Sequence, residues 1–194
     1  MRIIRAADCR RMPWKNGGGE TIEIAVSPAG AGLDDFDWRV SMARVEVDGP
    51  FSTFPGIDRT LAILEGEGMM LEIEGRSPGT LTVGSLPLSF PADVATAASL
   101  IAGPISDLNV MSRRGRSTHS VTRFAVREPV ELVAAADATF ILCQAGNAHA
   151  VADGEELEIG RFDALLIQTG HRMRLEAEAR SLFLKVEIRH ASPS

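Results

Sequence analysis

Three segments of the chain place polar side chains where they could bind a small molecule. Alternate residues of a β-strand share one face. In these segments an apolar face opposes a face that carries the following residues: Thr21, Glu23, Arg39, Ser41, Asp107, Asn109 and Met111. Such faces either meet water, as in a half-buried antiparallel sheet, or line the mouth of a barrel. The mixture with Ala43 and Met111, in place of surface lysines and glutamates, favours the barrel interpretation.

Two glycine-rich and proline-rich segments add aromatic and cationic candidates. Trp14, Lys15 and Asn16 precede three consecutive glycines, and the chain holds only one other lysine. The segment from Gly49 to Arg59 contains two prolines and two glycines, which predicts a rigid loop. That loop presents Phe51 and Phe54 and leads Arg59 into the next strand. The two rings form either a core plug or a pocket wall.

Residue patterns typical of catalytic or metal sites are missing from the sequence. No Gly-x-Ser-x-Gly turn is present, and Gly17–Gly19 is not followed by the Lys-Ser/Thr of a phosphate-binding loop. The four histidines are not spaced as metal ligands on one strand or helix. We therefore predict no catalytic residue, no metal and no cofactor.

Composition restricts the protein class. A net charge of -6 argues against nucleic-acid binding, which needs a basic surface. No apolar run approaches the ~20 residues of a membrane span, and Arg2 and Arg5 argue against a signal peptide. Two cysteines in no metal or redox pattern fit a reducing compartment, so we expect a soluble cytoplasmic protein. The basic run Arg113–Arg116 is interpreted as a solvated loop.

Short runs of Val, Ile, Leu and Phe between Gly, Pro, Asp and Ser clusters predict an all-β protein. The Ala-rich segment Asp93–Ile101 is predicted as a strand, and Asp8–Met12 as a helical turn. The order of strand, glycine turn and strand after Thr60–Leu64 is repeated after Thr139–Cys143. We therefore expect two halves, residues 1–114 with the ligand pocket and residues 115–194.

Four motifs carry a resemblance to a known family. They are Met12–Thr21, Trp38–Ala43, Gly49–Arg59 and Gly103–Met111, in this order. Together they resemble the HutD/Ves family, and Gly160–His171 resembles the second conserved segment of cupins. The chain departs from the family pattern at Phe90–Asp93, where members often have Phe-x-Gly-Asp. The resemblance implies a bicupin fold, with two cupin-like β-barrel or sandwich halves packed in one unit.

The resemblance also implies a role in histidine utilisation, as a non-enzymatic regulatory protein that binds an intermediate such as urocanate or formiminoglutamate. Arg39 or Arg59 would hold the ligand carboxylate. Glu23, Asp107 or Asn109 would meet its nitrogen atoms, and Trp14, Phe51 or Phe54 would cover its flat face.

Two other functions remain open from the residues. The first is a metal-independent cupin enzyme, an isomerase or hydrolase of a small carboxylate substrate, with Glu23 or Asp107 as general base. The second is an interaction module in which the Phe51–Phe54 loop contacts a partner or a second subunit, so that the protein forms a homodimer.

Overall fold

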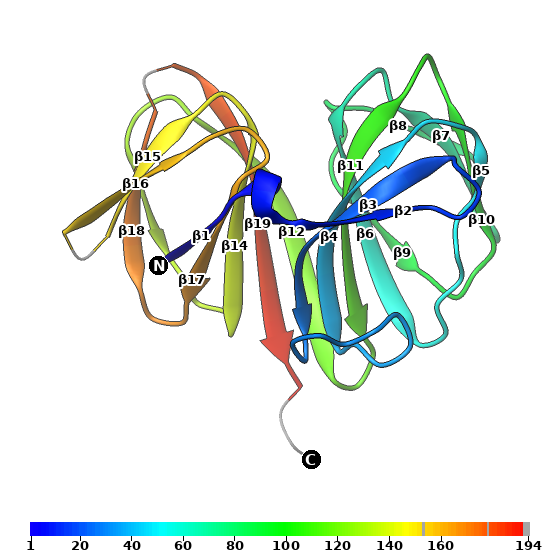
Figure 1. Cartoon of the computed structure of the whole chain (residues 1–194), viewed down its shortest axis with the longest axis horizontal. Helices are drawn as coiled ribbons and strands as arrows, with labels where there is room; N and C mark the ends of the chain where they lie inside the picture. The colour runs from blue at the N-terminus through cyan, green and yellow to red at the C-terminus, as the bar shows by residue number, and fades with distance from the viewer. Residues whose placement is uncertain (153, 178, 192–194) are drawn as a thin grey trace. The chain divides into compact units, whose positions relative to one another are not determined.

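The computed structural model describes residues 1–152, 154–177 and 179–191, and their regular structure is almost entirely β (Figure 1). A short 3-10 helix covers Ala6–Asp8. The strands are β1 (Arg2–Ile4), β2 (Arg10–Pro13), β3 (Gly19–Ser27), β4 (Trp38–Val45), β5 (Gly49–Pro50), β6 (Ile57–Glu65), β7 (Met69–Ile73), β8 (Gly79–Leu81), β9 (Leu88–Pro91), β10 (Thr96–Leu100), β11 (Ile105–Arg113), β12 (Ser117–Val126), β13 (Val130–Val133), β14 (Ala138–Ala145), β15 (Ala148–Ala152), β16 (Glu155–Ile159), β17 (Ala164–Gln168), β18 (Arg172–Glu176) and β19 (Ser181–His190). Among the described residues, no helix is long and apolar enough to cross a membrane.

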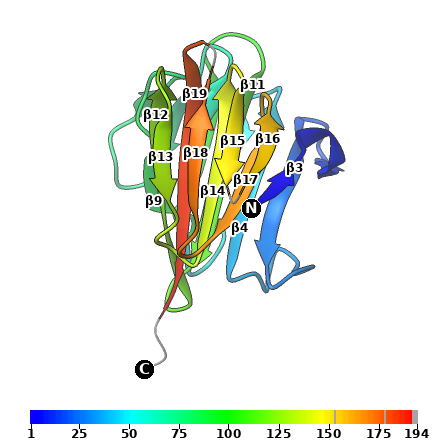
Figure 2. The ribbon, with the colours of Figure 1, turned by 90° about the vertical axis from the view of Figure 1, so that its left-hand side faces the viewer.

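The chain divides into two compact units. The N-terminal unit is Arg10–Thr118, and the C-terminal unit combines Met1–Cys9 with His119–Ser194. In the N-terminal unit a six-stranded sheet, β2-β3-β4-β11-β6-β9, faces a four-stranded sheet, β5-β10-β7-β8. The C-terminal unit has a five-stranded sheet, β1-β17-β14-β19-β12, and a four-stranded sheet, β13-β18-β15-β16 (Figure 2). Each unit is therefore a β-sandwich.

Strand alternation explains the apolar core of each sandwich. In the N-terminal unit Leu61 and Ile63 of the six-stranded sheet pack with Leu71 of the four-stranded sheet. In the C-terminal unit Ile141 packs with Leu175 in the same way. Because residues at i and i+2 share a face, Arg59 points to the same side of β6 as Leu61 and Ile63. The core positions thus define which side chains point between the sheets.

The structure confirms one ambiguous sequence prediction and overturns another. The Ala-rich segment forms β10, which pairs with β7, as expected. The helical turn predicted at Asp8–Met12 is wrong, because the helix ends at Asp8 and Arg10–Pro13 forms β2. This segment pairs with β3 as an edge strand, where a proline without an N–H is tolerated.

A β-bulge in β3 changes the face of one predicted apolar residue. Glu23 lies opposite Ser41 and Ala25 opposite Val40, so Ile24 is the additional residue. Strict alternation predicts that Val26 shares the face of Ile22 and Ile24. The bulge instead places Val26 opposite Arg39, and its side chain packs beside the small apolar cluster that contains Met111.

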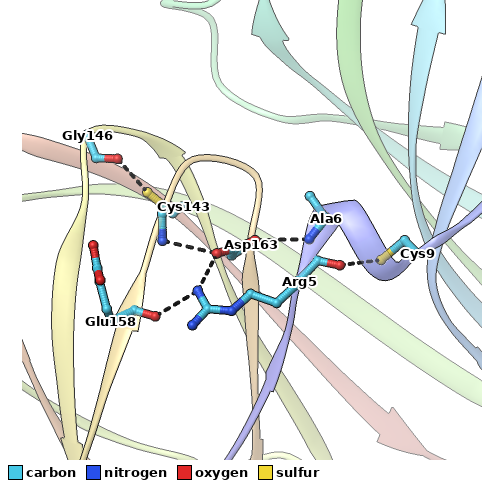
Figure 3. Close-up of polar contacts among 8 residues, drawn as sticks. Arg5, Ala6, Cys9, Cys143, Gly146, Glu158 and Asp163 are labelled. Carbon is cyan, nitrogen blue, oxygen red and sulfur yellow. Dashed lines mark hydrogen bonds and ion pairs between the residues drawn. The ribbon is translucent and has the colours of Figure 1, made fainter.

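Asp163 anchors the first residues of the chain within the C-terminal unit (Figure 3). Its carboxylate accepts hydrogen bonds from Arg5 Nη1 at 2.7 Å and from the Ala6 backbone N–H at 2.9 Å. Arg5 Nη1 also donates to the Glu158 carbonyl at 3.0 Å. β1 continues this attachment by pairing with β17.

Nearby, burial raises the pKa of the Cys143 thiol to about 11, which keeps it protonated and unreactive.

Replacing Asp163 by alanine is expected to lower the free energy of unfolding by about 2–3 kcal/mol, because charge-assisted hydrogen bonds to a mostly buried carboxylate are lost. Urea denaturation measures the change. Glu158→Gln is the matched control, since Arg5 contacts only the backbone carbonyl of that residue. Equal midpoints for Asp163→Ala and the control would contradict the anchoring role.

Candidate functional site

The predicted polar faces lie together on the inner side of the six-stranded sheet. Glu23 on β3 lies opposite Ser41 on β4, which lies opposite Asn109 on β11. In a second row Arg39 and Arg59 flank Met111. Thr21 and Asp107 flank Ala43 in a third row. Because Ala43 belongs to the core between the sheets, these faces point toward the four-stranded sheet rather than into bulk solvent.

Arg39 and Glu23 form one polar pair of this face. Arg39 Nε donates to Glu23 Oε2 at 2.9 Å, and the two side chains are 8% and 17% exposed. Arg39 Nη2 also lies 4.0 Å from Met12 Sδ. The carboxylate of Glu23 is thus held by a guanidinium on the neighbouring strand.

Arg59 is the most enclosed cation of the site, with 2% of its surface exposed. Its guanidinium carbon lies 5.1, 5.4 and 5.9 Å from the ring centres of Phe51, Phe54 and Phe90, within the range of cation–π attraction. Nη2 donates to the Ser52 carbonyl at 3.2 Å, while Nε has no hydrogen-bond partner among the described residues. Burial lowers the pKa of Arg59 to about 10, so the group stays charged at neutral pH.

Asp107 and Asn109 provide two acceptors on the neighbouring strand. Asp107 is 1% exposed, and its Oδ1 and that of Asn109 are buried without a partner among the described residues. Burial raises the pKa of Asp107 to about 7, although the attraction of Arg59 opposes the shift. Buried polar atoms are normally hydrogen-bonded, and a ligand would supply partners to the three unpartnered atoms of Arg59, Asp107 and Asn109 on this face.

The loop between β5 and β6 places its two aromatic rings over Arg59. Backbone hydrogen bonds from Phe51 N to Thr96 O and from Phe54 N to Ala92 O attach it to neighbouring segments, at 2.9 and 2.8 Å. Gly56 then adopts a φ of 73°, which turns the chain into β6. Phe51 packs beside the main core and Phe54 beside a smaller cluster, so both rings are part of the wall around Arg59.

The glycine-rich segment contributes only part of its predicted residues to this face. Trp14 Nε1 donates to Thr21 Oγ1 at 2.9 Å, and the indole packs against the core. Asn16 is exposed and closes the turn by accepting from the Gly18 N–H at 3.0 Å. Lys15 is exposed in the same turn. The structure therefore brings Trp14 to the site and leaves Lys15 and Asn16 on the outside of the turn.

Phe90 is a site residue that the sequence analysis missed. It lies directly opposite Arg59 in the pairing of β6 with β9 and is 3% exposed. The signal available in the sequence was its place in Leu88–Pro91, a short apolar run, but no local pattern links this run to Arg59. The pairing of β6 with β9, which β7 and β8 separate along the chain, supplies the third ring.

The basic run Arg113–Arg116 is more than the solvated loop expected from its composition. Arg113 donates to the Phe36 and Asp34 carbonyls, each at 2.9 Å. Arg114 pairs with Asp58 at 2.9 Å and with Asp93. The run therefore connects neighbouring loops of the N-terminal unit, and Asp93 of the divergent Phe90–Asp93 turn takes part.

The C-terminal unit shows how the same fold is built without these buried charges. The pairing of β6 with β11 and that of β14 with β19 each have one register shift, beside Ser106 and Asp107 in β11 and beside Leu182 and Phe183 in β19. Counting from this shared irregularity, the equivalent residues are Arg59 and Thr139, Asp107 and Phe183, and Asn109 and Lys185. An apolar ring thus occupies the position of the buried acid. The sandwich does not require an arginine and an aspartate there, which favours a functional reason for them.

No group of three His, Cys, Asp or Glu side chains in the described residues is arranged to hold a metal ion. The inner face of the N-terminal unit carries the polar groups of Arg59, Asp107 and Asn109. A fixed cation, two acceptors and surrounding rings are suited to hold a small ligand that has a carboxylate at one end.

Comparisons with known proteins identify relatives that match most of the chain. The chain is 31% identical over 189 residues, 97% of either protein, to a 21.2 kDa protein of the hutC 3′ region of Pseudomonas putida. It resembles the crystal structure of a conserved protein from Pseudomonas aeruginosa PAO1 with a TM-score of 0.88 and 32% identity, covering 97% of this chain and 98% of that one. It also resembles the structure of HutD from Pseudomonas fluorescens SBW25 (formate condition), with a TM-score of 0.81 and 30% identity, covering 98% of this chain and 99% of that one.

More distant structures confirm the predicted fold class. A cupin 2 conserved barrel domain protein from Leptotrichia buccalis matches with a TM-score of 0.62 at 11% identity, covering 87% of this chain and 88% of that one. The all-β fold with two cupin-like halves is thereby confirmed. Residues 6–184 match the HutD family, and because this match spans most of the sequence, the chain belongs to the HutD family.

Proposed function

We propose that this chain is a non-enzymatic regulatory protein of histidine utilisation that binds an intermediate such as urocanate or formiminoglutamate in its N-terminal unit. The observation that carries the proposal is Arg59, a buried cation beside three aromatic rings whose Nε has no partner among the residues that the structure describes. A carboxylate is the usual partner of such a guanidinium. Family membership, with a relative in a hutC 3′ region and another named HutD, supports the metabolic context.

Ligand entry in this proposal displaces part of the cover over Arg59. Arg59 is 2% exposed, and its guanidinium carbon lies 5.1 and 5.4 Å from the ring centres of Phe51 and Phe54 in this loop. Ser52 and Thr53, at the tip of this loop, are exposed. Movement of the tip releases the 3.2 Å hydrogen bond from Nη2 to the Ser52 carbonyl and leaves Nη2 with its 3.6 Å contact to Met111 Sδ, a weak acceptor. Nε and Nη2 then hold a carboxylate through two parallel hydrogen bonds.

Isothermal titration calorimetry with urocanate, formiminoglutamate and histidine tests this function. We expect saturable binding of at least one of the two intermediates, with one site per chain. Acetate is the comparison ligand, since it has only the carboxylate. The absence of saturable heat for all ligands, with protein shown to be folded by circular dichroism, would refute the proposal.

One observation favours a second function, a metal-independent cupin enzyme that acts on the same kind of substrate. The pKa of Asp107 near 7 is suited to proton transfer at neutral pH. Asp107 is the candidate general base, and Glu23 is paired with Arg39 at 2.9 Å. Conversion of urocanate or formiminoglutamate by the wild type, lost in Asp107→Asn with binding retained, would favour the enzyme.

Homodimer formation through the Phe51–Phe54 loop stays a prediction for sedimentation analysis.

A further inference from the structure

The two unpartnered acceptors of the site point to the chemistry of the other end of the ligand. Asp107 Oδ1 and Asn109 Oδ1 are buried and lack donors among the described residues, on the strand next to Arg59. A buried acceptor without a donor is unfavourable, and a ligand N–H relieves that cost. The ligand that satisfies all three atoms has a carboxylate at one end and an N–H group at the other.

The charged groups that face Asp107 are few. Arg59 comes from β6, Arg39 from β4 and Glu23 from β3, and the last two are paired with each other. The inner residues of the opposite sheet are apolar or uncharged: Met69, Leu71 and Ile73 of β7, Leu81 of β8, and Thr96 and Ala98 of β10. Within the described part of the chain, no hydrogen bond joins Arg59 to Asp107. The ionisation of Asp107 therefore responds to a ligand placed beside it.

We propose that Asp107 couples ligand binding to proton release, because a ligand N–H group that docks against this carboxyl stabilises its ionised form. The inference rests on the proposed function and adds a selection rule to it. A ligand with a cationic or N–H donor end binds with loss of the Asp107 proton. A ligand with only a carboxylate gains no such contact.

The proton coupling fixes the direction of the pH dependence. In the free protein the pKa of Asp107 is about 7, so the acid is mostly protonated at pH 6. Binding of a donor lowers this pKa, and the affinity falls as the pH decreases below about 7, by up to about tenfold per pH unit. Above pH 8 the carboxyl is already ionised, and both the affinity and the proton count become constant.

Formiminoglutamate is the probe for this experiment, because its amidine group stays protonated from pH 5.5 to 8.5 and does not itself titrate there. Calorimetry in two buffers of different ionisation enthalpy gives the number of protons released per ligand. We expect nearly one proton released at pH 6 and nearly none at pH 8.5. In Asp107→Asn the proton release disappears and the affinity becomes independent of pH over this range.

The possible results separate this inference from the proposed function. Saturable binding without proton exchange, or with proton uptake, overturns the coupling and leaves the binding function in place. Proton release that persists in Asp107→Asn also overturns it. If formiminoglutamate does not bind, the proton release is measured with urocanate in the wild type and in Asp107→Asn. The protons exchanged by the imidazole of urocanate itself are then subtracted. If neither ligand binds at any pH, the proposed function and the coupling fail together.

Discussion

Asp107→Asn is expected to raise the free energy of unfolding at pH 8 by about 3–4 kcal/mol and to change it by less than about 1 kcal/mol at pH 4. The carboxyl has an ordinary pKa of 3.8 and a pKa of about 7 in the folded chain. A raised pKa means that the folded state binds the proton more tightly than the unfolded state. The wild type therefore loses stability as the pH rises from about 4 to 7, and the asparagine variant does not.

Urea denaturation of both proteins at several pH values from 4 to 8 measures this difference. The matched control is Glu67→Gln, which removes an exposed carboxyl of the same unit. It should keep the pH dependence of the wild type. Parallel stability curves for Asp107→Asn and wild type would show that the pKa of Asp107 is not raised in the folded chain.

Arg59→Met is expected to weaken binding of urocanate or formiminoglutamate by at least about 100-fold, since a buried ligand carboxylate left without its charged partner costs several kcal/mol. Methionine fills the space beneath Phe51, Phe54 and Phe90 without a charge. Arg59→Lys should recover only part of the affinity, because an ammonium is a point charge and cannot hold a carboxylate through two parallel N–H groups.

Calorimetry at pH 8, where Asp107 is ionised in the wild type, measures these affinities. Arg44→Met is the matched control: Arg44 is an exposed arginine of β4, paired with Glu46 at 2.9 Å. That variant should bind like the wild type. Unchanged affinity in Arg59→Met, with the near-ultraviolet circular dichroism of the native fold, would exclude Arg59 as the carboxylate partner. Arg39 would then be the next arginine to test by substitution.

Both predictions concern charges that the fold itself does not need. Burial of an arginine and an aspartate is unfavourable unless other groups compensate. The C-terminal unit has Thr139 and Phe183 at the equivalent positions and forms the same strand pairing. The N-terminal unit keeps these two groups with Nε and Oδ1 unpartnered among the described residues, an arrangement that costs stability. In the proposed function, a ligand that supplies the missing hydrogen bonds offsets this cost.

Strand alternation within single segments could be predicted from the sequence, because it depends only on neighbouring residues. It placed Arg39 with Ser41 and Asp107 with Asn109 on common faces, and the registers of β4 and β11 agree. The motifs around Trp14, Trp38 and the Gly49–Arg59 loop also indicated the family, and the residue match over 6–184 confirms it. The shared strand faces and the family could therefore be predicted from the sequence.

Contacts between distant segments were decided only by the tertiary structure. Whether a polar face meets water or the second sheet depends on which strands pair and pack, and alternation is the same in both cases. The bulge at Ile24, the position of Phe90 opposite Arg59 and the attachment of Met1–Cys9 to the C-terminal unit all arise this way. The raised pKa of Asp107 has the same origin, because desolvation is a property of the packed interior and not of the residue.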